Sequence, residues 1–203
     1  FISANIKQIP TLGNQDLVQN YFKNNPLFKK LEIFSLYIDE LGYLWVSTQS
    51  KGLLKINPNS NQEDNIEVYT FNENDSNSLQ SNKVFNCRQD SYNRIWVTSS
   101  KGLDIIDLKD NSVKNILTDS DIGNSEVFNL TFDQQDNCWL GLSYGIYRFD
   151  IDKNEIRKYF RASSYGNFYN LNAISYSNDG TIYMGSRDGV TFFNPASIRN
   201  TEV

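Results

Sequence analysis

The chain has 203 residues, of which 39% are hydrophobic and 14% aromatic, so it is long and apolar enough to bury a substantial core. Its net charge of −5 is modest and its 19 basic residues are scattered singly, which argues against nucleic acid as a partner. The sequence contains no histidine, which excludes Ser-His-Asp and Cys-His triads and the usual zinc sites, and no apolar run approaches the roughly 18 residues of a membrane helix.

The first 32 residues resemble the second half of a repeat that follows later in the chain. We expect a strand at residues 6–10 and another at residues 17–22, in the positions of the third and fourth strands of a unit. Because the chain begins at Phe1 with neither a methionine nor a signal peptide, we interpret it as part of a longer protein.

Four copies of one sequence unit come next, at intervals of 51, 43 and 44 residues, and their central aromatic residues are Trp45, Trp96, Trp139 and Tyr183. Six positions before each aromatic residue stands Asp39, Asp90, Asp133 or Ser177, and six or seven positions after it stands Gly52, Gly102, Gly145 or Gly189. Each unit reads as an alternating strand, a turn with Gly or Asn, a strand around the aromatic residue, a glycine turn and a third strand. A fourth strand is expected from Ile66, Val113 and Glu155.

Four short antiparallel strands in about 45 residues are the period of a β-propeller blade, and the predicted fold class is therefore all-β, with β-propeller blades of four antiparallel strands. One propeller region is predicted over residues 1–203: strands 3 and 4 of a blade in 1–32, whole blades in 33–83, 84–126 and 127–170, and strands 1–3 of a last blade in 171–203. The two ends could pair to close a small ring of about four blades, or the chain could be an arc of a larger ring. We expect the arc, because most propellers have more than four blades.

The units share the pattern Asp-x-x-Gly/Asn-x-Leu/Ile-Trp-Val/Leu, followed by a glycine turn, and with it the chain resembles the two-component-regulator propeller repeat. The resemblance spans most of residues 33–195, and four units match in phase. The fourth unit departs from the pattern at Ser177 and Tyr183, and Ser47 and Thr98 stand where glycine is usual. The end of the chain, VTFFNPASIRNTEV, is similar to the family's exit from its second propeller into an immunoglobulin-like domain.

The resemblance implies a non-catalytic sensing module from the periplasmic ectodomain of a hybrid two-component histidine kinase. Such a module is expected to recognise an oligosaccharide or another glycan breakdown product and to relay the signal across the membrane. The implied partners are this small-molecule ligand, the rest of the receptor ectodomain and a second copy in a homodimer of the full receptor. No cofactor is expected.

The repeated residues are expected to be scaffold. An Asp before a turn accepts hydrogen bonds from turn amides, a mid-strand Trp packs between blades, and a glycine supplies positive φ. We interpret Cys87 and Cys138 as buried free thiols, because their spacing fits neither a CxxC motif nor a metal site. The acidic segment 119–126 has its glycine one place too early for an EF-hand loop, so no metal site is predicted.

Ligand-binding residues are expected where the units differ, because the loops between second and third strands and between blades crowd one face of a propeller. Residues 162–170 concentrate aromatic residues among small polar ones, which suits a sugar or a protein partner, or a connection that packs its own aromatic side chains. The ligand-binding candidates are Lys51, Lys101, Tyr144, Tyr165, Phe168, Tyr169, Arg187 and Asp188.

Two other functions remain open from the sequence. One is a protein-interaction or dimerisation scaffold of the receptor ectodomain, which open sheet edges and exposed aromatic residues would favour. The other is a propeller lyase or hydrolase acting on polysaccharide, because a fold does not fix a function. Such an enzyme would have to work with Asp, Glu, Tyr, Lys or Arg alone.

Overall fold

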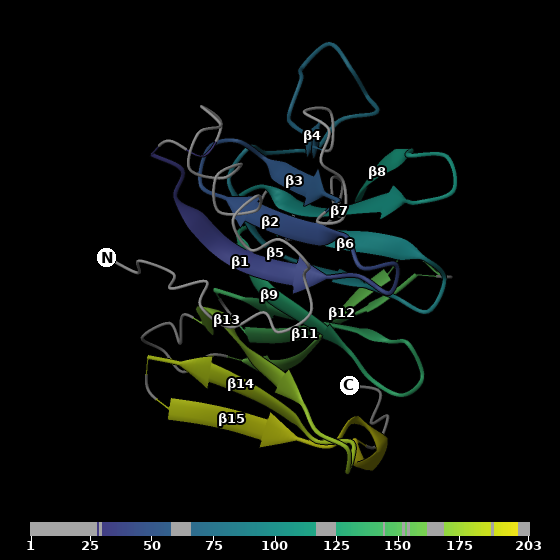
Figure 1. Cartoon of the computed structure of the whole chain (residues 1–203). Helices are drawn as coiled ribbons and strands as arrows, with labels where there is room; N and C mark the ends of the chain where they lie inside the picture. The colour runs from purple at the N-terminus through teal and green to yellow at the C-terminus, as the bar shows by residue number, and fades with distance from the viewer. Residues whose placement is uncertain are drawn as a thin grey trace, which may run out of the picture.

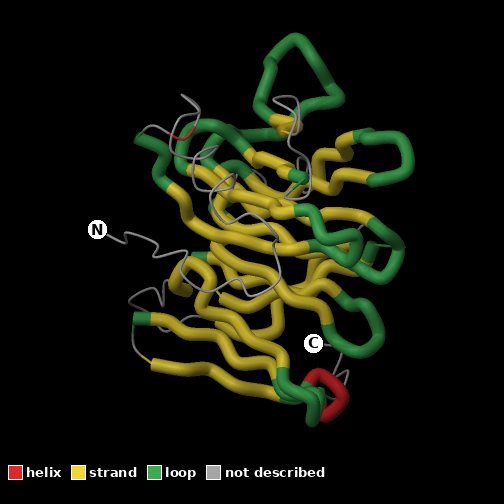
Figure 2. The backbone as a smooth tube through the Cα atoms, in the orientation of Figure 1, coloured by secondary structure: helices red, strands yellow, loops and turns green. Residues whose placement is uncertain are grey.

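The structure is a computed structural model, and it describes residues 28, 30–57, 66–116, 125–143, 145–151, 153, 155–161, 169–187 and 189–198. The chain forms four antiparallel sheets that are arranged as blades around a common axis (Figure 1). Strands dominate the trace, and short turns and loops connect them (Figure 2). The predicted all-β propeller fold is confirmed.

The sheets are named blades A to D in chain order, and in each of them the strands pair with their sequence neighbours. Blade A contains β1 (Ile33–Ile38), β2 (Leu44–Thr48), β3 (Leu53–Ile56) and β4 (Ile66–Tyr69). Blade B contains β5 (Val84–Gln89), β6 (Arg94–Ser99), β7 (Gly102–Asp107) and β8 (Val113–Ile116). Blade C contains β9 (Val127–Phe132), β10 (Cys138–Leu142), β11 (Gly145–Asp150) and β12 (Glu155–Arg161). Blade D contains β13 (Tyr169–Tyr176), β14 (Ile182–Ser186) and β15 (Gly189–Phe193), and a 3₁₀ turn, Pro195–Ser197, follows it. The strands predicted at residues 6–10 and 17–22 lie outside the described residues.

Tryptophans from the second strands hold neighbouring blades together. Trp45 belongs to a cluster shared by blades A and B, Trp96 to one shared by B and C, and Trp139 to one shared by C and D. The three side chains are at most 2% exposed. Burial of a side chain of this size contributes about 5 kcal/mol of transfer free energy, so these contacts are a main source of cohesion between blades.

The first strands of the blades, β1, β5, β9 and β13, surround the axis, and β13 lies beside β1. Phe34, Phe85 and Phe128 each occupy a β-bulge in these strands, and their rings touch in series, with centroids 5.8 and 5.5 Å apart. A bulge re-aims its side chain, which brings the three rings together. In blade D, Asn172 holds the corresponding place, and its Nδ2 donates a hydrogen bond to the Phe34 carbonyl oxygen at 2.5 Å.

This contact between the first and last blades corrects the preference for an open arc. The four inner strands close into a ring at the axis because the bulged Asn172, with a φ of +59°, reaches the backbone of β1. The sequence pattern does not contain this information, because the bulge in β13 spans several residues and departs from the other three units.

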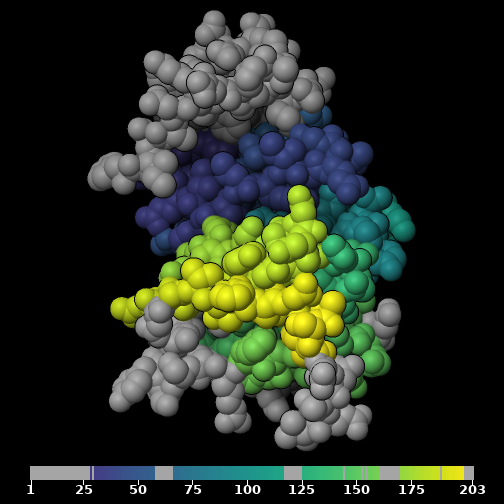
Figure 3. All heavy atoms as spheres, turned by 90° about the horizontal axis from the view of Figure 1, so that it is seen from below, coloured from purple at the N-terminus to yellow at the C-terminus, as the bar shows by residue number. Residues whose placement is uncertain are grey.

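Blades A and D leave apolar side chains on the surface. On blade D, Tyr183, Val190 and Phe192 are exposed, and on blade A so are Leu36 and Ile38. Tyr183 stands where the other blades have a buried tryptophan, and it is 39% exposed. Strands β14 and β15, in yellow, lie at the surface in the space-filling view (Figure 3). Blade D therefore presents a sheet face of the kind that the next blade covers elsewhere in the ring.

Candidate functional site

The repeated aspartates are fully engaged in structural hydrogen bonds. In blades A, B and C, one carboxylate oxygen accepts from two backbone amides of the first turn, at 2.9–3.0 Å. The other oxygen accepts from the indole Nε1 of the tryptophan six residues later, at 2.7–2.8 Å. The residues in these pairs are Asp39 and Trp45, Asp90 and Trp96, and Asp133 and Trp139. These carboxylates therefore join the first turn of each blade to its tryptophan.

The two cysteines are buried free thiols in the structure. Burial raises the pKa of Cys87 to about 12, and burial together with the nearby charges of Asp90 and Asp133 raises the pKa of Cys138 as well. A thiol held in its protonated form is a poor nucleophile and a poor metal ligand. These positions therefore belong to the core.

The predicted ligand-binding residues are only partly described. Lys51, Lys101 and Arg187 are exposed, each in the turn between the second and third strands of its blade. Tyr169 begins β13, but its side chain is not among those described. Those that lie outside the described residues are Tyr144, Tyr165, Phe168 and Asp188.

Lys101 lines a cavity of about 540 Å³ beside the loop that joins blades A and B. Its Nζ lies 5.2 Å from the centroid of the Phe71 ring, a cation–π geometry. Most of the other residues that line the cavity are polar, among them Asn72, Gln80 and Asn115. It is the place where a predicted residue and an aromatic ring come together.

Asp104 lies buried behind this cavity. It accepts hydrogen bonds from the Gln80 backbone amide at 3.1 Å, from Gln80 Nε2 at 2.9 Å and from Asn115 Nδ2 at 2.9 Å. Burial raises the pKa of its carboxyl to about 6 in spite of these donors. Asp104 is 0% exposed, so it anchors the inter-blade loop and does not face a ligand.

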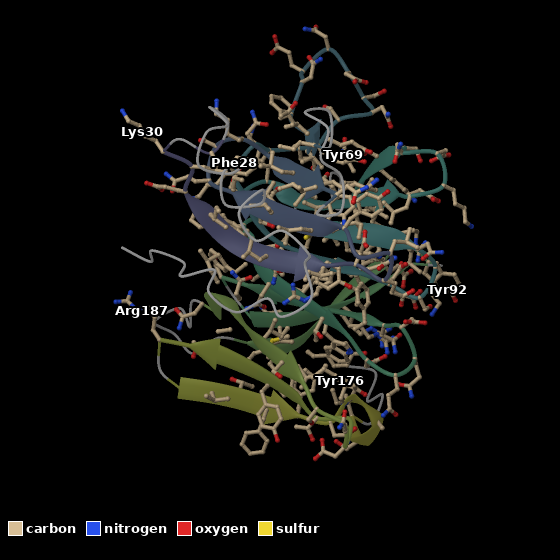
Figure 4. All side chains as sticks on the ribbon, in the orientation of Figure 1. Phe28, Lys30, Tyr69, Tyr92, Tyr176 and Arg187 are labelled. Atoms are coloured by element: carbon tan, nitrogen blue, oxygen red, sulfur yellow. The ribbon has the colours of Figure 1, made fainter. Side chains whose placement is uncertain are left out.

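A larger cavity of about 600 Å³ lies between blades B and C, at the other end of the blades. It is bordered by the turns β5–β6, β7–β8, β9–β10 and β11–β12. The predicted candidates Lys51, Lys101 and Arg187 lie instead in the turns between the second and third strands of their blades. In Figure 4, Tyr92 of this cavity and Arg187 lie at opposite sides of the molecule. The structure thus offers a second candidate site, away from the residues predicted from the sequence.

Tyr92 is the aromatic side chain at the rim of this cavity, and it is 60% exposed. The Arg94 guanidinium lies 4.9 Å from the centroid of the Tyr92 ring. Arg94 is itself fixed by Asp90, with Nε and Nη2 at 2.7 and 2.6 Å from the same carboxylate oxygen. The repeat aspartate therefore orients the arginine, and the arginine supports the exposed ring.

The rest of the cavity combines an apolar floor with a charged rim. Ile105 and Phe149 contribute apolar surface, and Lys114, Asp107, Asp136 and Asp150 contribute charges. Ser91 Oγ donates to Asp136 Oδ2 at 2.5 Å, which ties the first turns of blades B and C together across the cleft. Hydrogen bonds from Lys153 hold the pKa of Asp150 below its usual value, so this carboxylate is an acceptor at neutral pH.

A smaller cavity of about 190 Å³ continues from the first and shares Gln135 and Asn137 with it. It lies between blades C and D, and Arg148 covers the Tyr159 ring at 5.7 Å from the centroid. Two adjacent clefts at one end of the blades, each with an aromatic ring and a guanidinium, can hold an extended ligand that carries many hydroxyl groups.

The signal for this site was present in the repeat but was attributed to turns. Tyr92 occupies a variable position inside the first turn of its unit, where an exposed aromatic residue has no structural requirement. Asp136 stands at the turn position that has positive φ in every unit. Among the described residues, no cluster of three or more potential metal ligands occurs. Within the same part of the chain, no helix has the length and hydropathy needed to cross a membrane.

No protein-family model and no curated protein matches the sequence. Solved structures do match the fold. One is the extracellular domain of BT3049, a candidate hybrid two-component system of B. thetaiotaomicron, with a TM-score of 0.69 and 20% identity over 85% of this chain and 23% of that chain. Another is the extracellular domain of BT4673 from the same organism, with a TM-score of 0.61 and 17% identity over 79% of this chain and 21% of that chain.

The chain thus spans less than a quarter of the length of these two ectodomains. They are of the class that the repeat motif resembles, so the resemblance is confirmed at the level of the fold. Virginiamycin B lyase from Staphylococcus aureus also matches, in a form that a histidine-to-alanine substitution makes catalytically inactive. Its TM-score is 0.58, with 17% identity over 82% of this chain and 57% of that chain. The same fold therefore occurs in an enzyme.

Proposed function

We propose that the chain is a ligand-sensing module of a periplasmic two-component receptor and that it binds an oligosaccharide or another glycan breakdown product. The observation that carries the proposal is the cavity between blades B and C, with the exposed Tyr92 ring held by Arg94. A sugar ring can place its C–H face on Tyr92 while its hydroxyl groups reach the charged and amide side chains of the rim.

The charge balance of the cavity disfavours an anionic ligand, which is consistent with a neutral sugar. Arg94 is neutralised by its ion pair with Asp90, and Lys114 stands among several carboxylates. Carboxylates accept hydrogen bonds from hydroxyl groups, and amides both donate to them and accept from them. Because these bonds have fixed directions, such a rim can select a ligand that carries no net charge. The adjoining cavity at Arg148 and Tyr159 provides room for a second sugar unit.

Calorimetry of the chain against a panel of neutral glycan oligosaccharides tests this function. We expect one class of oligosaccharide to bind, and Tyr92→Ala to weaken its binding at least tenfold, because the ring supplies the stacking surface. Leu41→Ala, at the same turn position of blade A, is the matched control and should leave the affinity unchanged. If no member of the panel binds, or if Tyr92→Ala binds as tightly as the unaltered chain, the proposal is contradicted.

A non-catalytic role is preferred over a lyase. The matching lyase is inactive when one histidine is replaced by alanine, and this chain contains no histidine. Prolonged incubation with the oligosaccharide that binds should leave it intact, as followed by mass spectrometry. Release of a shorter or unsaturated product would support the lyase instead.

A second candidate function is an interaction scaffold in the ectodomain, favoured by the exposed face of blade D. Tyr183 and Phe192 stack there with centroids 6.1 Å apart, and Phe192 is 69% exposed. We propose that this face binds the same face of a second copy of the chain, since two identical faces can pair about a two-fold axis. Sedimentation equilibrium should show a dimer that Phe192→Ser dissociates. A concentration-independent monomer of the unaltered chain would exclude it.

A further inference from the structure

The cleft between blades C and D contains a half-buried arginine that has no acidic partner in the described part of the chain. Arg148 lines the cavity of about 190 Å³, and its guanidinium lies over the Tyr159 ring. None of the ion pairs between described residues includes Arg148. Its N–H donors are therefore available to a ligand in the cavity.

A comparison with blade B explains why this arginine is unpaired. In blade B, the residue two places before the tryptophan is Arg94, and its guanidinium binds the repeat aspartate, Asp90. In blade C, the same place is held by Asn137, whose Nδ2 donates to both oxygens of Asp133 at 3.0 Å. The aspartate of blade C is thus satisfied by an amide, and Arg148, which comes from the next strand, keeps its positive charge without a counter-ion.

A second arginine lies directly beside the first. Arg157 on β12 is the cross-strand partner of Arg148 on β11, so both side chains leave the same face of the sheet, with Cβ atoms about 5 Å apart. The next pair on this face is Asp150 and Glu155, and Asp150 binds Lys153 at 3.2 Å. Like charges directly opposite each other destabilise a sheet. An anion between the two arginines would remove this repulsion.

The surroundings of Arg148 select the class of anion. A guanidinium binds a carboxylate through two parallel hydrogen bonds. Apolar surface comes from Pro195 and Ile198, and Gln135 and Asn137 border both this cavity and the larger one. The cavity is smaller than the roughly 300 Å³ at which pockets for drug-sized ligands begin, so it suits a single small unit. A carboxylate on a hydroxyl-bearing ring matches these features.

We propose that the cleft between blades C and D is a binding site for a sugar acid, whose carboxylate is held by Arg148 and Arg157. The inference rests on the proposed function in one respect, namely that the sugar acid is a unit of the oligosaccharide that stacks on Tyr92. The arginine of the first cleft is neutralised by Asp90, whereas the arginine of the second is not. A neutral unit therefore occupies the first cleft and the acidic unit the second, which fixes the direction of the ligand.

NMR titration of the ¹⁵N-labelled, unaltered chain tests the site without any variant. The probes are D-glucuronate, D-glucose and acetate, each added at the same ionic strength. We expect D-glucuronate to shift the Arg148 Nε–Hε signal in a saturable way and D-glucose to leave it in place. Acetate should saturate this shift only at a higher concentration, because it lacks the ring that contacts the apolar wall and the amides.

Two variants of equal charge locate the site. Arg148→Gln should weaken the binding of D-glucuronate at least fivefold, as measured by titration calorimetry. Arg187→Gln, which removes one exposed positive charge at the other end of the blades, is the matched control and should keep the affinity. The proposal is overturned if D-glucuronate causes no saturable shift, if D-glucose or acetate binds as well, if Arg148→Gln keeps the affinity, or if both variants lose it equally.

The outcome for the proposed function is read separately. A neutral oligosaccharide that binds through Tyr92, combined with no response to D-glucuronate, overturns this site and leaves the proposed function standing. Binding of D-glucuronate at Arg148, combined with no oligosaccharide binding at Tyr92, supports this site and contradicts the proposed function.

Discussion

Asp90 shows how one residue serves both the scaffold and the candidate site. Its carboxylate accepts from the amides of Tyr92 and Arg94, from the Arg94 side chain and from the Trp96 indole. The aspartate was predicted from sequence as a turn cap, but its bond to the tryptophan was not. That bond depends on the pairing of the first two strands, which places the side chains six residues apart next to each other.

Replacement of this aspartate should destabilise the protein strongly. Asp90→Ala leaves the buried Trp96 indole N–H and three part-buried N–H groups without this acceptor, and we expect the free energy of unfolding to fall by roughly 3 kcal/mol in urea denaturation. Glu40→Ala, an exposed carboxylate in the equivalent turn of blade A, is the control and should have a much smaller effect. Equal losses for the two variants would show that the hydrogen bonds of Asp90 are not what stabilises the blade.

Asp104 should give the protein a distinct dependence of stability on pH. Its pKa in the folded chain, about 6, is above the ordinary 3.8, so the folded chain binds this proton more tightly than the unfolded chain. The contribution of Asp104 is therefore greatest at the acidic end, declines as the pH rises from about 4 to about 6, and is constant above that. The decline amounts to roughly 2–3 kcal/mol.

The measurement is urea denaturation between pH 4 and pH 7 for the unaltered chain and for Asp104→Asn. The variant should lack this decline, and Asp110→Asn, at an exposed carboxylate, should retain it. Superimposable pH profiles for the unaltered chain and Asp104→Asn would contradict the assignment.

At the scale of the strands, the glycine turns decide how closely neighbouring strands approach. Gly42 and Gly52 both have positive φ, +85° and +71°, as a tight turn requires. They differ in their surroundings, because a Cβ at Gly42 has no neighbour within 4 Å, whereas a Cβ at Gly52 collides with the Tyr69 carbonyl at the end of β4. The sequence indicates the turn, but only the packing of the third strand against the fourth shows the close approach.

This difference predicts unequal costs for the same substitution. Gly42→Ala should lower the free energy of unfolding by roughly 1 kcal/mol, the cost of a left-handed conformation for an L-residue. Gly52→Ala should lower it by roughly 2–4 kcal/mol, because β4 must also shift. Denaturation of the two variants in parallel is the check, and a Gly52→Ala variant no less stable than Gly42→Ala would refute the steric argument.

The strands could be predicted from the local sequence, whereas their closure into a ring could not. The fourth strands expected from Ile66, Val113 and Glu155 are β4, β8 and β12. Their alternating residues and flanking turns are local signals. The contact of Asn172 with Phe34 joins residues near opposite ends of the described chain, so a pattern that repeats about every 45 residues cannot predict it.

The whole molecule presents two ends with different chemistry. One end carries the variable loops with Lys51, Lys101 and Arg187, from which the ligand site was predicted. The other end carries the cleft between blades B and C, where Tyr92 and Arg94 border the larger cavity. The cleft could not be predicted from the repeat, because its walls come from turns of two blades that only the fold brings together.

The most direct test of the account is therefore to measure by calorimetry which end binds the selected oligosaccharide, with Tyr92→Ala and Arg187→Ala compared side by side. Both residues are exposed, so neither substitution should lower the melting temperature appreciably. We predict that Tyr92→Ala weakens binding at least tenfold and that Arg187→Ala binds like the unaltered chain. Loss of binding in Arg187→Ala with full affinity in Tyr92→Ala would place the site at the other end and contradict the account.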